Sequence, residues 1–253
     1  VAAHLTHLGL AGVEPNQVVT SAQAAAKLVS KLVQPGDPVL VVGGDGLREA
    51  VIDLDLVPVT SVAEQPKAIV QGFSPTLNWE MLAEATIAVR SKIPWIAANL
   101  DATLPTSRGA LPGNGSFVQL IANITGASPI VAGKPQRHLF DETVRREHSR
   151  NPLVVGDRID TDIQGAVNAQ MESLLVLTGV TNLEQVIRSD VRPTFVAPDL
   201  RGITQIHPAV AINKAKAMCG QAVAQVAAGT VQVVTPDGPL LEIVRAIVAL
   251  AWH

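Results

Sequence analysis

The sequence predicts an α/β fold with a Rossmann-like, parallel-sheet core. Short apolar runs alternate with segments of helical periodicity through most of the chain, and Gly, Pro and Asn residues separate them. Strands that alternate with helices form parallel sheets through right-handed crossovers. The strands are too many for one sheet, so we expect two α/β layers.

The predicted elements follow one another in a regular order. Residues 1–9 carry apolar side chains at helical spacing, and Thr20 or Ser21 can begin a helix over residues 22–33. Strands are expected over residues 38–42, 68–70, 95–98, 129–132, 153–155, 174–177 and 194–196. Helices are expected over residues 47–51, 78–91, 116–125, 138–147 and 182–188, with an irregular segment over 99–114.

The pattern changes after Gly202. Apolar, β-prone segments over residues 222–226 and 230–234 are followed by an apolar helix over residues 240–252. This pattern predicts a small α+β extension, a hairpin or meander with a terminal helix. This extension carries no group of acids, bases or metal ligands typical of an active site, so we expect it to have a structural role or to contact a second subunit.

Composition narrows the classes of function. The formal net charge is -3, and the chain has no Tyr, which argues against nucleic-acid binding. Cys219 is the only cysteine, so an intrachain disulfide is impossible and the cytoplasm is the expected compartment. No apolar run is long enough for a membrane span. The chain begins with Val1 inside an expected helix, so we expect that its start is missing.

An acidic loop follows the apolar run at residues 153–155. Gly156 lets the chain turn, and Asp157 then lies at the carboxyl end of a strand, where open α/β sheets bind ligands. Asp157, Asp160 and Asp162 place three carboxylates within six residues, which is costly without a cation. Asp162 or the preceding Thr can also cap the next helix. A solvated acidic loop is the alternative, but we expect Asp157 to bind Mg²⁺, which takes oxygen ligands.

Lys134 follows the expected strand at residues 129–132. We expect that strand and the one before Asp157 to belong to one sheet, so that Lys134 and Asp157 lie at the same edge. A Lys ammonium beside a metal-bound phosphate offsets the charge of the phosphoryl oxygens. A lysine after a strand is otherwise an ordinary surface residue. The pairing with the acidic loop favours the functional interpretation.

Two stretches resemble motifs of a known family. Gly133-Lys134-Pro135, about twenty residues ahead of Gly156-Asp157-Arg158-Ile159-Asp160-Thr161-Asp162-Ile163, resembles the third and fourth motifs of the haloacid-dehalogenase-like phosphatases. Residues 18–22, 71–73, 98–101 and 111–116 are similar to the large α/β cap of the NagD-like branch. The resemblance covers about residues 1–202. The tail is similar to the extension of actinobacterial members described as glycerol 3-phosphate phosphatases.

The resemblance implies a division into domains. Residues 1–17 and 131–206 would form the core, which lacks its first strand. Residues 18–130 would form an inserted α/β cap, and residues 207–253 the extension. The family's first motif, Asp-x-Asp-Gly, is absent, because Asp53-Leu54-Asp55 lacks the Gly and lies in the cap. The resemblance therefore implies that the nucleophilic Asp lies upstream of Val1.

The resemblance also implies roles for individual residues. Asp157 would hold Mg²⁺, Lys134 would bind the phosphoryl group and stabilise the transition state, and Asp162 would orient Lys134 or a metal-bound water. An upstream Asp would form an aspartyl-phosphate intermediate. The catalytic set is therefore Lys134, Asp157 and Asp162, and the substrate-binding set is Lys134, Asn99, Asp101, Leu104 and Arg158.

The substrate expectation comes from the cap loop. Asn99 and Asp101 can bind hydroxyl groups, and Leu104 stands where relatives specific for pyridoxal phosphate carry a His. We expect glycerol 3-phosphate, with phosphoglycolate or another sugar or metabolite phosphate as alternatives. A phosphoryl-transfer mutase and an inactive phosphate-ligand-binding protein are the rivals. The expected partners are a small phosphorylated metabolite and a second copy bound through the cap or extension, without nucleic acid or membrane.

Overall fold

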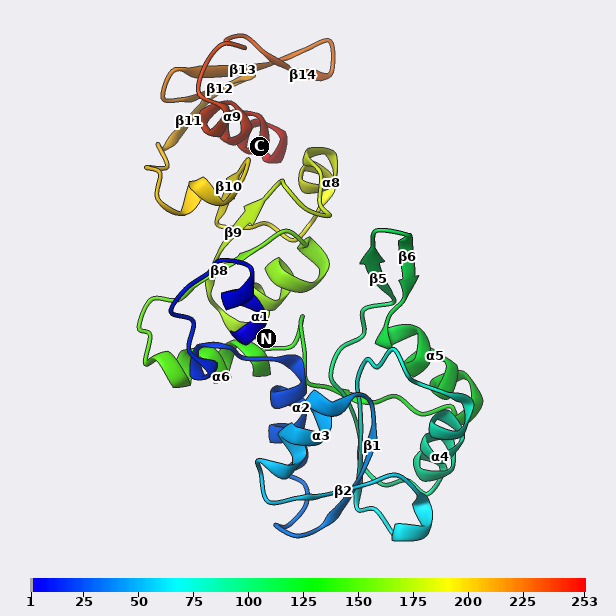
Figure 1. Ribbon diagram of the computed structural model, residues 1–253. Coiled ribbons are helices and arrows are strands. Elements are labelled where there is room, and N and C mark those ends of the chain that lie inside the picture. Colours follow the sequence, from blue (N-terminus) through cyan, green and yellow to red (C-terminus); the bar gives the residue numbers. More distant parts are fainter. Residues whose placement is uncertain (1) are drawn as a thin grey trace. The chain divides into compact units, whose positions relative to one another are not determined.

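The computed structural model describes residues 2–253, with Pro105 described by its backbone only, and it divides into two compact units (Figure 1). The first unit ends at Ser149, and the second runs from Arg150 to His253. The α/β class predicted from the sequence is confirmed, with parallel sheets in both units. Within residues 2–253, no helix is long and apolar enough to cross a membrane.

The first unit contains a five-stranded parallel sheet with the order β2-β1-β3-β4-β7. From β1 the chain continues to β2 on one side, and from β3 it continues to β4 and β7 on the other side. The strand order therefore reverses between β1 and β3, and open α/β sheets bind ligands at the carboxyl ends of the strands at such a point. The strands are β1 (Pro38–Val42), β2 (Val57–Val59), β3 (Ala68–Gln71), β4 (Trp95–Ala97) and β7 (Ile130–Val131).

Both faces of this sheet are covered by helices. Val39 and Val41 of β1 pack into a core with α2 and α3, and the alternate residues Leu40 and Val42 pack into a second core with α4 and α5. This follows from the period of two along a strand, and it explains why β1 reads as a continuous apolar run. The helices are α1 (Ala2–His7), α2 (Ser21–Val29), α3 (Asp45–Ile52), α4 (Trp79–Arg90), α5 (Asn114–Thr125) and α6 (His138–Glu147), with 3-10 turns η1 (Pro15–Gln17) and η2 (Val62–Glu64). Val1, part of the expected first helix, lies outside the described residues.

The segment expected to be irregular contains an antiparallel hairpin. Its strands are β5 (Thr103–Thr106) and β6 (Gly109–Pro112), and the hydroxyl of Thr106 donates to the Gly109 carbonyl at 2.8 Å. The expectation was wrong over these residues because Pro and Gly weaken the strand signal in the sequence. The exposure of β6 along its whole length also removes the apolar alternation that marks a half-buried strand.

The second unit contains a three-stranded parallel sheet with the order β10-β9-β8. Its strands are β8 (Leu153–Gly156), β9 (Glu172–Val176) and β10 (Phe195–Ala197), and its helical segments are the π-helix η3 (Ile159–Ile163), α7 (Gln164–Ala169), α8 (Leu183–Arg188) and the 3-10 turn η4 (Leu200–Ile203). The prediction that β7 and β8 share one sheet is wrong, because β7 pairs with β4 and β8 pairs with β9.

The extension is a four-stranded antiparallel meander covered by one helix. The predicted meander and terminal helix are confirmed, although the first two strands were not expected. The apolar helix packs against the meander through a small core that contains Cys219, Ala246 and Leu250. The elements are β11 (Val210–Asn213), β12 (Lys216–Cys219), β13 (Ala222–Ala227), β14 (Thr230–Val233) and α9 (Leu240–Trp252).

Ile96 in the middle of β4 tests the packing of the five-stranded sheet. Its side chain is fully buried, so Ile96→Ala should lower the free energy of unfolding by about 2–5 kcal/mol through lost contacts and a residual cavity. Ile87→Ala on α4 is the matched control, because Ile87 is 47% exposed and should cost about 0.5 kcal/mol. Urea denaturation measures both, and equal losses would contradict the assignment of this core.

Candidate active site

Asp157 is held in place by the loop that follows β9. Its carboxylate oxygen Oδ2 accepts a hydrogen bond from the N–H of Val180 at 2.8 Å, and its carbonyl accepts one from the N–H of Thr181 at 3.0 Å. The buried Thr181 hydroxyl in turn accepts the N–H of Ile159 at 3.3 Å. Two loops at the carboxyl edge of the sheet therefore bind each other through Asp157.

Gly179 makes this arrangement possible. A Cβ atom at residue 179 would lie 1.9 Å from the Oδ2 atom of Asp157, well inside contact distance. Any side chain there would displace the carboxylate or the loop. Glycine at position 179 is therefore a requirement for the observed position of Asp157.

Asp162 has a different role from the predicted helix cap. Its side chain is only 5% exposed, and its Oδ2 atom accepts the N–H groups of Asp157 at 3.2 Å and Arg158 at 3.1 Å. A Cβ at Gly156 would lie 2.4 Å from the Cβ of Asp162, so glycine is required here too. The capping prediction is wrong because η3 runs directly into α7, and the residue before α7, Ile163, is itself helical. Asp162 therefore closes the loop that presents Asp157.

Arg158 pairs with Asp160 on the surface of the same loop. The guanidinium donates from Nε to Oδ1 at 3.0 Å and from Nη2 to Oδ2 at 2.6 Å. The three carboxylates that looked crowded in sequence thus have three different partners. Asp160 has Arg158, Asp162 has backbone N–H groups, and Asp157 has one N–H from the neighbouring loop.

The oxygen donors fit a hard cation at Asp157. Within the described part of the chain, no group of three or more His, Cys, Asp or Glu side chains could hold a metal by itself. Mg²⁺ does not require such a group, because it commonly binds one or two carboxylates together with phosphate oxygens and water. Asp157, whose carboxylate is half-buried at the end of a strand and accepts one backbone N–H, is the residue of this loop that suits that role.

Lys134 lies between β7 and α6, in the first unit. It is half-buried, and the preceding Gly133 is buried against the chain after β4, where a Cβ would lie 2.2 Å from the Ala98 carbonyl oxygen. Asp157 belongs to the second unit. The predicted meeting of Lys134 with Asp157 and Asp162 therefore stays a prediction.

The helix that follows Lys134 is held by an ionic cluster. Glu142 accepts from Arg145 at 2.7 Å and from Arg146 at 2.9 Å, and Arg146 also donates to the Val18 carbonyl at 3.3 Å. Hydrogen bonding to Arg145, assisted by Arg146, lowers the pKa of Glu142 to about 2. The cluster ties α6 to the segment that leads into α2.

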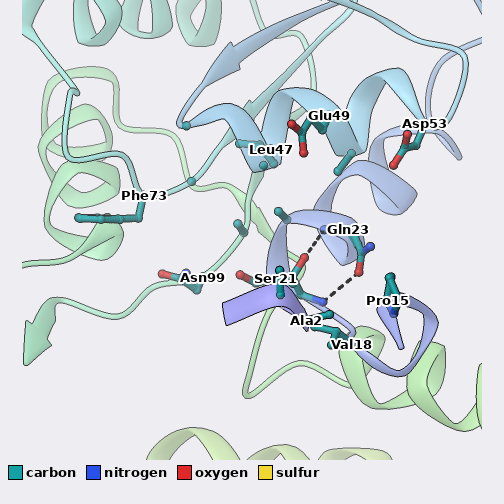
Figure 2. A pocket seen from close by; sticks show the side chains of 18 residues that line it. Ala2, Pro15, Val18, Ser21, Gln23, Leu47, Glu49, Asp53, Phe73 and Asn99 are labelled. Carbon is teal, nitrogen blue, oxygen red and sulfur yellow. Dashed lines mark hydrogen bonds between the residues drawn. The ribbon is translucent and has the colours of Figure 1, made fainter. Parts of the chain in front are cut away.

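A cavity of about 610 Å³ lies in the first unit (Figure 2). It opens at the carboxyl ends of β1, β3 and β4, where Gly44, Phe73 and Asn99 line it. Asn99 is thus the predicted substrate residue that the structure places at a cavity. Asp101 and Leu104 are exposed on the same loop but do not line it.

The sequence had not singled out Phe73, Gln23 or Glu49 as cavity residues. Figure 2 shows the side chain of Gln23 bonded back to the start of α2. Thr20 Oγ1 accepts the Gln23 N–H at 3.2 Å, and Gln23 Oε1 accepts the Thr20 N–H at 3.1 Å. This capping box confirms Thr20 as the start of the helix. Its Thr-x-x-Gln spacing is visible in the sequence and identifies the start of α2, whereas the contribution of that start to a cavity appears only in the structure.

Two family profiles match the chain. One, described as HAD-hydrolase-like, matches residues 131–203, and the other, described as haloacid dehalogenase-like hydrolase, matches residues 1–57. The D-glycerol 3-phosphate phosphatase of Mycobacterium tuberculosis is 43% identical over 259 residues, covering 100% of this chain and 73% of that protein. The chain belongs to the haloacid dehalogenase-like hydrolases. The family predicted from the Lys134 and Asp157 motifs is thereby confirmed.

Other relatives in the family are also phosphatases. The acid sugar phosphatase of Staphylococcus aureus is 36% identical over 189 residues, covering 74% of this chain and 72% of that protein. The solved M. tuberculosis glycerol phosphate phosphatase in complex with magnesium has a TM-score of 0.88 and 44% identity, covering 99% of this chain and 76% of that one. The structure of a p-nitrophenyl phosphatase from Archaeoglobus fulgidus has a TM-score of 0.72 and 28% identity, and the match covers 79% of this chain and 78% of that one.

The ionic cluster on α6 predicts a specific pH dependence. The pKa of Glu142 is depressed in the folded state, so its contribution to stability is present above pH 4.5 and is lost as the pH falls toward 2. A shift of this size corresponds to about 3 kcal/mol, and screening around Arg145, which is 67% exposed, reduces it to about 1–2 kcal/mol.

Glu142→Gln should therefore lower the free energy of unfolding by about 1–2 kcal/mol at pH 6 and by only about a quarter of that at pH 2.5. Glu184→Gln, in an exposed pair with Arg188, is the control and should change it by about 0.5 kcal/mol or less. Urea denaturation at the two pH values measures the difference. A loss for Glu142→Gln that does not vary with pH would contradict the role of its charge.

Proposed function

We propose that the complete protein is a Mg²⁺-dependent phosphatase that hydrolyses glycerol 3-phosphate. The observation that carries the proposal is the identity of 43% to a D-glycerol 3-phosphate phosphatase over 100% of this chain. The acid sugar phosphatases match 74% of it. The geometry around Asp157 supports the same conclusion, because it presents a carboxylate at the carboxyl end of β8.

The residues of the second unit would prepare the metal site. Asp157 would bind Mg²⁺, which when bound offsets the charge of the phosphoryl oxygens. Asp162 keeps the N–H groups of residues 157 and 158 bonded, so the loop keeps its shape before substrate arrives. Arg158 is engaged by Asp160, so binding a phosphate would require it to share or exchange that partner.

Lys134 would bind the phosphoryl group. Its ammonium would stabilise the charge that develops on the transferring oxygens. The attacking group would be an aspartate upstream of Val1, which would form an aspartyl-phosphate that water then hydrolyses. The HAD-hydrolase-like family profile begins at residue 131, where the core is predicted to resume after the cap.

The cap would bind the leaving group. Asn99 lines the cavity, and its Oδ1 atom accepts the N–H of Asp101 at 3.3 Å, so the amide Nδ2 is suited to donate to a substrate hydroxyl. Asp101 would accept from a second hydroxyl and would repel a carboxylate such as that of phosphoglycolate. Leu104, 40% exposed, would contact the carbon skeleton. A sugar phosphate is the second candidate, favoured by the acid sugar phosphatase relatives.

Two further properties belong to the proposal. The enzyme would work in the cytoplasm, because its single cysteine points to a reducing compartment. It would form a homodimer through the cap or the extension. Cell fractionation tests the first property, and light scattering tests the second, where the mass of one chain would refute the dimer.

Asp157→Asn tests the metal assignment. An amide is a poorer ligand than a carboxylate for a hard cation, so kcat/KM for glycerol 3-phosphate should fall at least 100-fold, about 2.7 kcal/mol. The dissociation constant for Mg²⁺, measured by calorimetry, should rise at least tenfold while the melting temperature without metal changes little. Asp190→Asn, at an exposed position, is the control. Unaltered Mg²⁺ affinity in Asp157→Asn would refute the assignment.

A substrate comparison tests the loop. We expect kcat/KM to be highest for glycerol 3-phosphate, lower for phosphoglycolate, which Asp101 would repel, and lower for pyridoxal phosphate, which finds no aromatic partner on this loop. Steady-state kinetics on the complete protein measures all three. If either alternative is preferred tenfold or more, about 1.4 kcal/mol in transition-state binding, the substrate assignment is wrong.

A further inference from the structure

The loop between β4 and β5 is held by the first residues of α5. Four hydrogen bonds connect them, and all four acceptors are carbonyl oxygens of the loop. The bonds run from Asn114 Nδ2 to Asn99 at 2.8 Å, from Gly115 N–H to Asp101 at 2.9 Å, from Gly113 N–H to Ala102 at 2.9 Å and from Ser116 Oγ to Ala102 at 2.7 Å. We call residues 113–116 the loop clamp.

Two glycines bring the clamp within reach of the loop. A Cβ at Gly115 would lie 2.2 Å from the carbonyl oxygen of Leu100, and a Cβ at Gly113 would lie 2.3 Å from that of Asp101. Both obstacles are backbone atoms, which cannot rotate away as a flexible side chain can. Any larger residue at either position would therefore push the loop out of its present place.

A second segment supports the same loop from residue 133. A Cβ at Gly133 would lie 2.2 Å from the carbonyl oxygen of Ala98 and 3.4 Å from the Cβ of Asn99. Gly133 directly precedes Lys134. The loop is therefore in backbone contact with the segment that carries the predicted phosphate-binding lysine.

Stability alone does not explain a buried Asn at position 114. It is 2% exposed, and its Oδ1 atom has no hydrogen-bond partner among residues 2–253. A buried acceptor without a partner lowers the free energy of unfolding, so the Oδ1 atom of Asn114 destabilises the fold. The Nδ2 atom of Asn114 donates to the Asn99 carbonyl, and this bond gives the residue a role in positioning the loop.

We propose that the loop clamp is a set of positioning residues that determines which leaving group the enzyme accepts. The clamp holds the loop by its carbonyl groups, while the side chains of Asp101 and Leu104 stay exposed. Fixing the backbone fixes where those side chains, and Asn99 at the cavity, can meet a substrate. The inference rests on the proposed function, because it assigns substrate contacts to this loop.

Steady-state kinetics on the complete protein tests the proposal with two substrates. The leaving group of glycerol 3-phosphate carries hydroxyl groups that the loop would bind, and the leaving group of methyl phosphate carries none beyond the ester oxygen. In Asn114→Ala and in Ser116→Ala, KM for glycerol 3-phosphate should rise at least fivefold, while kcat/KM for methyl phosphate stays within twofold. Asn78→Ala, which removes the Asn cap of α4, is the matched control and should change neither value. Parallel changes for both substrates, or no change, would overturn the proposal.

Amide hydrogen exchange provides a measurement that needs no substrate. In the Asn114→Ala/Ser116→Ala double variant, the amides of Gly113 and Gly115 should exchange at least tenfold faster, because the loop carbonyls that accept them are no longer held. Unchanged exchange would overturn the clamp even if glycerol 3-phosphate is the substrate. Faster exchange in an enzyme that does not hydrolyse glycerol 3-phosphate would keep the clamp and refute the proposed substrate instead.

Discussion

The candidate site depends on a few glycine positions at which a Cβ atom would not fit. At the carboxyl ends of the strands, loops approach one another so closely that only glycine fits. The Asp157 carboxylate lies against Gly179, the Asp162 side chain against Gly156, and the Leu100 carbonyl against Gly115. Each close approach brings backbone N–H groups or carbonyls into hydrogen-bonding range of a functional segment. The glycines thus determine the geometry, although they carry no chemical group themselves.

Backbone N–H groups help to hold the acidic loop in shape. Asp162 is buried and bonded to two N–H groups, and Asp157 accepts one from Val180. These hydrogen bonds fix the shape of the loop, and polar groups held in place beforehand lower the cost of stabilising charge during a reaction. Asp160 differs, since its partner is the side chain of Arg158.

Local features could be predicted from the sequence, and long-range pairings could not. The run Pro38–Val42, the Gly156-Asp157 turn and the helix Leu240–Trp252 are determined by neighbouring residues, and all three are present. The sheet to which β7 belongs depends on its partner β4, more than thirty residues earlier, and no local pattern reports that choice. The loop clamp escaped prediction for the same reason: Gly-Asn-Gly-Ser reads as a helix start, and its bonds to residues 99–102 appear only in three dimensions.

The extension is part of the core of the second unit and not an appendage to it. One side of α9 contributes Val244 and Val248 to the core that contains Leu175 of the parallel sheet. The other side packs on the antiparallel meander through Ala246. A helix that is apolar on two sides needs a partner on each of them. The meander therefore covers a surface that the parallel sheet cannot, and through α9 it supports the sheet that presents Asp157.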